Sequence, residues 1–277
     1  FNTNHIPAPT CQELNGKIQN GDSSESLKAL EDLLREKHAE TACVIIEPSV
    51  QGAAGMKLLP PGYTAAVANL CKQYDVHLIC DEVFVGFGRL GSLIISTEEK
   101  VVPDFICLAK GLTAGYLPLA ATLVKNEIYD AFLGTYESRK AFFHGHTFTG
   151  NPLGCAVALE NIRKLESMIS SGKLSRSIKV FGELLEAAFN KHPKVLSLRQ
   201  RGLTAAIDLD PTAKRYLGDE YPEVRLGLRV CLEARRHGLL LRPLGNSLLL
   251  VPPLCLFEDE LSQLIEKTLV SINTILP

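Results

Sequence analysis

The chain has 277 residues, of which 46% are hydrophobic and 22% are charged, so it carries enough apolar material to bury a substantial core. Its 29 lysines and arginines nearly cancel its 31 acidic residues, and no segment concentrates basic side chains. This balance argues against nucleic acid and against an anionic membrane as partners. The longest apolar runs are also far shorter than the roughly 20 residues of a membrane-spanning helix.

The start of the chain and its cysteines bear on its origin. The first residues, FNTNHIP, contain neither an initiating methionine nor the apolar core of a signal peptide. We therefore expect either a fragment of a longer protein or a natural truncated product. The eight cysteines form no Cys-x-x-Cys pair, and several lie inside apolar runs such as 42–46. Buried reduced thiols are typical of intracellular proteins, so we predict a cytoplasmic location.

Residues 1–150 alternate short apolar or β-branched runs with helical patterns, which is typical of a parallel α/β architecture. Helical spacing of apolar residues predicts one helix over 27–34 and a second after Pro60 and Pro61. The predicted strands cover 43–46, 76–80, 105–109 and 119–124. The first of them is entirely apolar, so we expect it to be buried on both faces. The turn before the last is too short for a crossover helix, which implies antiparallel pairing.

From residue 152 onward, helices are followed by short strands. The predicted helices cover 152–165, 174–191, 223–237 and 258–275, and the predicted strands cover 195–198, 204–209, 239–241 and 248–251. We interpret the chain as a larger α/β domain over residues 1–166 and a smaller α+β domain over residues 167–277. No linker rich in proline or glycine marks the boundary between them.

Two charged residues stand at the carboxyl ends of predicted strands, where ligands bind in open parallel sheets. Asp81 follows one strand and Lys110 the next, about one crossover connection later. A carboxylate beside an amine suits pyridoxal-phosphate chemistry, in which a lysine holds the aldehyde as an imine and a carboxylate keeps the pyridine nitrogen protonated. The alternative is a solvated aspartate and a surface lysine, because charges at strand ends are common.

The surrounding sequence narrows this choice. Two runs, LICDEVFVGFGR at 78–89 and PDFICLAKG at 103–111, resemble the signature of class III pyridoxal-phosphate-dependent aminotransferases. Three further runs are similar to the same family: IEPSVQG at 46–52, HGHTFTGNP at 144–152 and LRPLG at 241–245. The resemblance implies the aspartate-aminotransferase-like α/β fold (fold type I), with a mostly parallel sheet in a large domain truncated at its N-terminus. A smaller C-terminal domain would follow.

The resemblance also implies roles for single residues. Lys110 would be the catalytic Schiff-base lysine, and Asp81 would pair with the pyridine nitrogen of pyridoxal 5'-phosphate. The implied cofactor-binding set is Lys110, Asp81, His146, Thr147, Gln51 and Glu47. His146 and Thr147 match positions that reach the cofactor phosphate of the other subunit, which implies a homodimer with sites at the interface. Gly145 would lie beside the substrate.

Within the family, segments 50–56 and 242–253 are most similar to members that aminate 8-amino-7-oxononanoate to 7,8-diaminononanoate in biotin biosynthesis. Arg242 stands among apolar residues, where a desolvated guanidinium needs an anion, and a keto acid with a distant carboxylate supplies one. Pairing with an internal acidic residue or with solvent is the alternative. The implied substrate-binding set is Gly145, Arg242, Lys110 and Arg89, although Arg89 is also open to interpretation as a surface arginine.

The substrate assignment leaves alternatives open. The amino donor is S-adenosylmethionine or lysine, and no residue decides between them. Another class III omega-aminotransferase, acting on acetylornithine, ornithine or an omega-amino acid, is the alternative enzyme. A phosphate-binding loop at a helix N-terminus is expected in the family and is missing from this sequence. A non-catalytic remnant or scaffold would also lack it, but the joint presence of Asp81, Lys110, Thr147 and Arg242 favours an enzyme.

Two other chemistries are disfavoured. His144 and His146 alternate along an extended segment, but no third histidine or cysteine stands at ligand spacing, so we expect no metal. Gly86, Gly88 and Gly91 follow Asp-Glu and do not lead a strand directly into a helix, which argues against a dinucleotide site.

Overall fold

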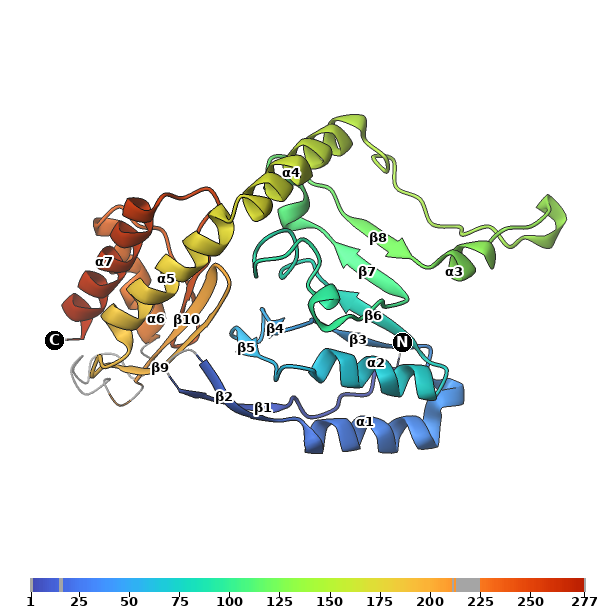
Figure 1. Ribbon diagram of the computed structural model, residues 1–277, viewed down its shortest axis with the longest axis horizontal. Helices are drawn as coiled ribbons and strands as arrows, with labels where there is room; N and C mark the ends of the chain where they lie inside the picture. Colours follow the sequence, from blue (N-terminus) through green and yellow to red (C-terminus); the bar gives the residue numbers. More distant parts are fainter. Residues whose placement is uncertain (1, 15–16, 211, 213–224, 277) are drawn as a thin grey trace.

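A computed structural model describes residues 2–14, 17–210, 212 and 225–276. Its first large sheet has four strands in the spatial order β3 (Cys43–Ile46), β6 (His77–Asp81), β7 (Phe105–Leu108) and β8 (Ala121–Val124). The first three are parallel, and β8 pairs antiparallel with β7 (Figure 1). This confirms the mostly parallel sheet and the antiparallel last strand expected from the sequence.

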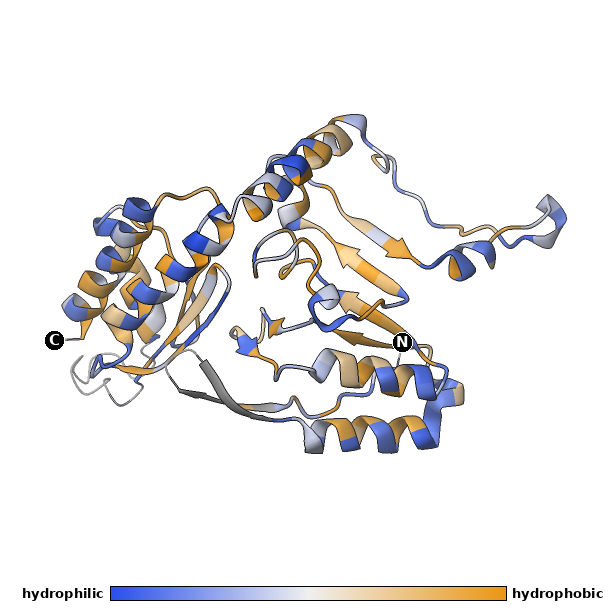
Figure 2. Cartoon of the chain, in the orientation of Figure 1, coloured by the Kyte–Doolittle hydropathy of each residue, from blue (hydrophilic) through white to orange (hydrophobic). Residues whose placement is uncertain are grey.

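Helices α1 (Ser24–Lys37) and α2 (Tyr63–Gln73) lie on one side of this sheet, with α2 in contact with β3 and β6 and α1 packed beside α2 (Figure 1). Both helices carry apolar and polar residues in alternating bands (Figure 2). Their apolar residues form one buried cluster with the sheet, which includes Leu30, Leu34, Val67, Cys71, Leu78 and Cys80. Burial of this apolar area is the main force that holds the layer together.

The first turn of α2 is stabilised from a distant part of the chain. Its N-cap is Gly62, which has no side chain to bond the free amides of the first turn. The carboxylate of Glu99 accepts hydrogen bonds from the N–H groups of Gly62 (3.0 Å) and Ala65 (2.9 Å) instead. Glu99 thereby supplies both the missing cap and a negative charge at the positive end of the helix dipole.

The prediction that strand 43–46 is buried on both faces is wrong. Ile46 is buried against the helices, but Cys43 is exposed and Ile45 is 65% exposed. The reason is that β3 is an edge strand, and the described helices cover only one face of it. An apolar run identifies a strand but does not show how many of its faces are covered.

The second large sheet is antiparallel throughout. Its strands, in spatial order, are β11 (Arg242–Leu244), β12 (Ser247–Leu250), β10 (Thr204–Leu209) and β9 (Val195–Arg201). Helices α5 (Lys173–Phe189), α6 (Leu226–Arg236) and α7 (Glu258–Ile275) pack against it (Figure 1). A separate core, which includes Phe181, Phe189, Ile207 and Ile265, fills the space between them.

Helix α4 (Pro152–Ser170) joins the two parts (Figure 1). It begins with a proline in its first turn, and the side-chain oxygen of Asn151 accepts a hydrogen bond from Leu153 N–H at 3.0 Å. The predicted boundary between residues 166 and 167 falls inside this helix. Its last residues already belong to the second part, because Met168 and Ile169 pack against the second core.

Some elements differ from the sequence-based expectation. Residues 239–241 are not a strand; β11 begins only at Arg242, because the chain first turns at Gly238, where φ is 72°. Residues 223–224 of the predicted helix 223–237 lie outside the described residues, and the described part of it is α6. The unpredicted elements are β1 (Thr10–Leu14), β2 (Lys17–Asp22), β4 (Val50–Gln51), β5 (Lys57–Leu58), α3 (Asn126–Asp130), η1 (His38–Glu40), η2 (Ser96–Glu99), η3 (Lys110–Thr113) and η4 (Tyr136–Ser138).

Residues 131–150, which we call the arm, extend away from both sheets between α3 and α4 (Figure 1). Every residue of the arm is exposed, including Tyr136, Phe142, Phe143 and Phe148. Large exposed aromatic side chains of this kind mark a surface that another molecule covers. Within the described residues, no helix combines the length and the apolar character needed to cross a membrane.

Candidate active site

Asp81 and Lys110 lie at the same edge of the first sheet, as the sequence predicts. Asp81 is the last residue of β6, and its partner in the parallel register is Cys107 of β7. Lys110 comes two residues after β7 ends and begins η3. The Asp81 carboxylate accepts a hydrogen bond from Val83 N–H at 3.0 Å, which fixes its orientation beyond the strand end.

Both residues line one pocket of about 1010 Å³. The first sheet supplies one part of its wall, and residues 238–256 with helix α7 supply another. The charged residues of the wall are Glu47, Asp81, Lys110, Arg242, Glu260 and Lys267. Most of the remaining lining is apolar, so the pocket suits a molecule that has both polar and apolar parts.

Lys110 has an unusual backbone conformation. Its φ is 44°, in the left-handed region that a residue with a side chain occupies at a cost of about 1 kcal/mol. Its Nζ lies 5.5 Å from the ring centroid of Phe84, within the range of a cation–π contact. The next residue, Gly111, packs tightly against Phe87, because a Cβ at Gly111 would lie only 2.8 Å from Cβ of Phe87. The amine is therefore placed by tight backbone packing rather than by a mobile loop.

Glu47 is electrostatically coupled to the same pair. Its Oε2 accepts a hydrogen bond from Gly52 N–H at 3.0 Å, and the residue is half-buried. The pKa of its carboxyl lies above the ordinary value, mainly because burial disfavours the charged form. The hydrogen bond from Gly52 and the charge of Lys110 lower this pKa, and the charge of Asp81 raises it further. Three ionisable groups thus share one end of the pocket.

Arg242 also lines this pocket, at the start of β11, together with Leu239, Leu240 and Leu241. Arg242 is exposed, so burial alone does not force its guanidinium to pair with an anion. The three leucines precede the strand and form pocket wall instead of strand. Arg242 is therefore accessible to an anion inside the pocket.

Arg89 is not among the described residues that line the pocket. Its Nη1 donates to the carbonyl oxygens of Leu203 (2.8 Å) and Pro252 (2.7 Å), so it is not a surface arginine. Gln51 lies in the short strand β4 opposite Lys57, and it too is outside the described lining.

The predicted phosphate and substrate contacts at Gly145, His146 and Thr147 lie on the exposed arm and not in the pocket of their own chain. The ring of His146 has a local partner, because Nδ1 accepts a hydrogen bond from Phe148 N–H at 3.2 Å. Among the described residues, no group of three or more histidine, cysteine, aspartate and glutamate side chains could hold a metal, and His144 and His146 have no third ligand.

The sequence did not identify the contribution of α7. Gln263, Leu264 and Lys267 line the pocket with Glu260, and all four belong to one face of that helix. The spacing i, i+3, i+4, i+7 is visible in the sequence, but three of the four residues are polar, which is the ordinary pattern of the solvent-facing side of a helix. Phe84 was also missed as a pocket residue, although it lies three residues after Asp81 in the recognised motif.

Comparisons with known proteins agree with this geometry. The family model described as aminotransferase class III matches residues 2–272. An adenosylmethionine-8-amino-7-oxononanoate aminotransferase from Geobacter sulfurreducens is 44% identical, over 99% of this chain and 61% of its own length. A crystal structure with the same protein name, from Methanocaldococcus jannaschii, superimposes with a TM-score of 0.82 at 37% identity and covers 91% of this chain and 58% of that one.

A third relative is an amine transaminase from an uncultivated Pseudomonas species, solved with pyridoxal phosphate bound. It has a TM-score of 0.78 at 34% identity, over 91% of this chain and 56% of its own. The chain thus spans about three fifths of the length of the relatives it matches. The fold is that of the fold type I aminotransferases. Because the family model covers nearly every residue, the chain belongs to the class III aminotransferase family.

Proposed function

We propose that this protein is a pyridoxal-phosphate-dependent aminotransferase that converts 8-amino-7-oxononanoate to 7,8-diaminononanoate. The observation that carries the proposal is the placement of Asp81 and Lys110 on one pocket wall, at the carboxyl edge of two neighbouring parallel strands. The names of the similar proteins from Geobacter sulfurreducens and Methanocaldococcus jannaschii support the choice of substrate.

The donor set fits the cofactor. When bound, pyridoxal phosphate supplies an electron sink for the carbon that gains or loses the amine. Lys110 would bind the cofactor through Nζ and carry a proton at that atom during transfer. Asp81, oriented by Val83 N–H, would hold a proton at the ring nitrogen. Glu47 would flank the ring, where its coupling to Asp81 and Lys110 adjusts the charge of the site. Gln51 would flank the cofactor ring as well, from β4.

The other wall suits a long keto acid. Leu239, Leu240 and Leu241 would contact the methylene chain, and Arg242 would bind the terminal carboxylate through two parallel hydrogen bonds. The distance between the two ends of the pocket would then decide which chain length fits. The amino donor would be S-adenosylmethionine or lysine.

We further propose a homodimer with sites at the subunit interface and a cytoplasmic location. The exposed aromatic side chains of the arm support the dimer, since a partner would cover them and receive His146, Thr147 and Gly145 beside its own pocket. Buried free thiols support the location: burial raises the pKa of Cys71 and of Cys80 to about 12, which keeps both protonated and unreactive.

The absorption spectrum tests the mechanism. The complete gene product, supplied with pyridoxal phosphate, should show a visible band from lysine-bound cofactor. Lys110→Ala should abolish the band, and Lys267→Ala, which removes an amine that α7 contributes to the lining of the same pocket, should retain it. A wild-type protein without the band would be a non-catalytic scaffold. A band that survives Lys110→Ala would refute the role of Lys110.

A substrate panel tests the specificity. The wild-type protein should aminate 8-amino-7-oxononanoate with S-adenosylmethionine or lysine as donor. Faster turnover of ornithine, acetylornithine or an omega-amino acid would replace the substrate assignment and leave the aminotransferase assignment standing.

A further inference from the structure

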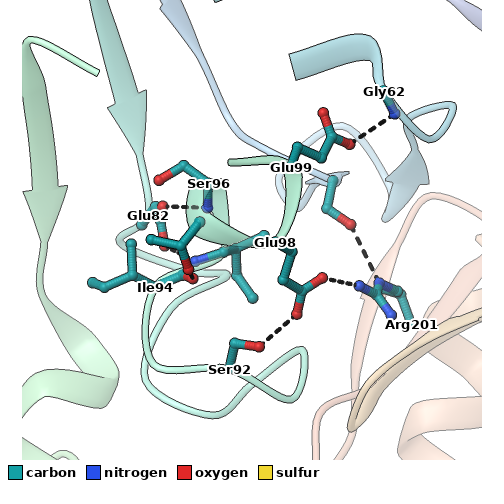
Figure 3. Close-up of polar contacts among 11 residues, drawn as sticks. Gly62, Glu82, Ser92, Ile94, Ser96, Glu98, Glu99 and Arg201 are labelled. Atoms are coloured by element: carbon teal, nitrogen blue, oxygen red, sulfur yellow. Dashed lines mark hydrogen bonds and ion pairs between the residues drawn. The ribbon is translucent and has the colours of Figure 1, made fainter. Parts of the chain in front are cut away.

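Glu82 is the most deeply buried acidic residue near the pocket. It follows Asp81 directly, its side chain is 0% exposed, and it is not among the described residues that line the pocket. A carboxylate in this position is stable only if hydrogen bonds replace the lost water. The structure shows two such bonds. Oε1 accepts from Ser96 N–H, at the start of η2, at 2.8 Å (Figure 3). Oε2 accepts from Ile95 N–H at 2.5 Å.

These bonds close a loop of the chain. Residues 83–96, which we call the 83–96 loop, leave the sheet after Glu82 and return to its carboxylate at Ile95 and Ser96. Inside the loop, Phe87 N–H donates to the Leu93 carbonyl at 2.8 Å. At the sheet end, Glu82 N–H donates to the carbonyl of Cys107 in β7 at 3.0 Å, so the base of the loop is attached to the strand that leads to Lys110.

The 83–96 loop contacts Lys110 and its neighbour directly. The Phe84 ring lies 5.5 Å from Nζ of Lys110. Phe87 packs against Gly111 so closely that a Cβ at Gly111 would lie 2.8 Å from the Cβ of Phe87. The place of the amine therefore depends on the shape of this loop, because both aromatic residues belong to it.

We propose that Glu82 is a positioning residue for the active-site amine: by closing the 83–96 loop it fixes Phe84 and Phe87, and through them the place of Lys110 relative to Asp81. The inference rests on the proposed function, since it treats Lys110 as the reacting amine. Glu82 does not contact the pocket itself, so its effect passes through backbone hydrogen bonds and packing.

Glu98 provides a matched control in the same network. Its carboxylate accepts from Ser92 Oγ at 2.6 Å and pairs with Arg201 of β9 (Figure 3). Glu98 is exposed. One of its bonds leads to the second sheet and the other to Ser92 in the outer part of the 83–96 loop, and neither involves Phe84 or Phe87. Loss of Glu98 should therefore loosen the outer side of the loop without moving the amine.

The test compares Glu82→Gln with Glu98→Gln in the complete gene product. Glutamine has one acceptor oxygen, so its amide group would face the N–H of Ile95 or Ser96 and one of the two bonds would be lost. Without cofactor, the amides of residues 95 and 96 should exchange hydrogen faster in Glu82→Gln than in wild type. With pyridoxal phosphate, the pH midpoint of its visible absorption should shift. The single-turnover rate should fall roughly tenfold or more, while keto-acid affinity stays unchanged.

Glu98→Gln should match wild type in the absorption midpoint and in the single-turnover rate. Glu82→Asp keeps a carboxylate and should restore part of the lost rate. If Glu82→Gln fails to fold, the absorption midpoint and the single-turnover rate are measured on Glu82→Asp instead. The proposal is overturned if wild type shows the band and Glu82→Gln has an unchanged midpoint and rate, or if Glu98→Gln reproduces its effects. A wild-type protein without the band would overturn the proposed function instead.

Discussion

Arg89 donates a hydrogen bond of 2.7 Å from Nη1 to the carbonyl oxygen of Pro252, a residue that lines the pocket. The same nitrogen donates to the carbonyl of Leu203, and Leu203 N–H donates to the carbonyl of Arg89 at 2.9 Å. Burial lowers the pKa of the guanidinium to about 10, which still leaves it protonated at neutral pH. One side chain thus joins the 83–96 loop to the second sheet and to the pocket wall.

Replacing Arg89 with methionine should destabilise the protein and loosen the pocket. The two carbonyl groups would lose their donor inside the protein, which costs about 2 kcal/mol of unfolding free energy. Urea unfolding should show this loss. Because Pro252 would no longer be held, KM for the keto acid should rise more than kcat falls. Arg163→Met, at an exposed position of α4, should change neither the unfolding free energy nor KM for the keto acid. A stable Arg89→Met protein that loses only keto-acid binding would indicate direct substrate contact instead.

Gly202 supports the same junction from the second sheet. Its φ is 59°, and a Cβ there would collide with the carbonyl oxygen of Arg89 and with Cα of Leu90. We expect Gly202→Ala to cost about 3 kcal/mol, because overpacking against backbone is added to the strain of a left-handed alanine. Thermal unfolding checks this. Gly172→Ala is the control, since its φ is 73° and nothing lies within 4 Å, so it should cost only about 1 kcal/mol. Equal losses of stability in the two variants would show that the backbone at Arg89 and Leu90 shifts to make room for the added Cβ.

Much of the fold was predictable because hydrophobic periodicity reports burial directly. Helix α7 matches its predicted range, and so does β10, where apolar residues fill a closed core. The errors occur where burial depends on parts distant in sequence. The exposure of Ile45 reflects the edge position of β3, and residues 239–241 are apolar because they line a pocket.

The site was predictable to the extent that a short motif carries it. Asp81 and Lys110 were placed correctly because parallel strands present their carboxyl ends at one edge. The arrangement of Arg89 was not predictable, since its partners are backbone carbonyls more than a hundred residues away. Carbonyl groups carry no sequence signal, so only the fold shows these two hydrogen bonds.

Asp104 lies at the edge of the first sheet away from the pocket, where β6 and β7 begin and β8 ends. Its carboxylate accepts from Leu78 N–H at 2.7 Å and pairs with Lys125 Nζ at 2.7 Å, while His77 lies nearby. Burial tends to raise the pKa of this carboxyl, but the hydrogen bonds and the charges of Lys125 and His77 outweigh it and hold the pKa below its ordinary value of 3.8. The folded state therefore binds the proton less tightly than the unfolded state.

Asp104→Asn should keep an oxygen for Leu78 N–H and lose the ion pair, at a cost of about 1 kcal/mol at pH 7 because Lys125 is partly exposed. The stability difference between wild type and variant should be complete above pH 3.8 and should vanish as pH falls through the lower pKa of the folded state. Urea unfolding at a series of pH values measures it. A difference that does not depend on pH would show that the ion pair contributes nothing.

Arg242→Ala should weaken binding of the long keto acid much more than binding of a short amine. A guanidinium–carboxylate contact that is partly open to solvent contributes enough for an affinity loss of roughly tenfold to a hundredfold. Only the substrate with a distal carboxylate can use it, because a short amine bound at Lys110 does not extend to residues 239–242. Arg242→Lys keeps the charge but not the planar pair of donors, so it should restore part of the affinity.

The competing explanation is a general disturbance of the second sheet. Arg176→Ala removes an arginine from the surface of the same part of the protein, where its Nε donates to Glu258 at 2.7 Å, and should leave both substrates unaffected. If Arg242→Ala raises KM equally for the keto acid and the short amine, Arg242 does not bind the carboxylate. The remaining cation of that wall, Lys267, would then be the group to test against chain length.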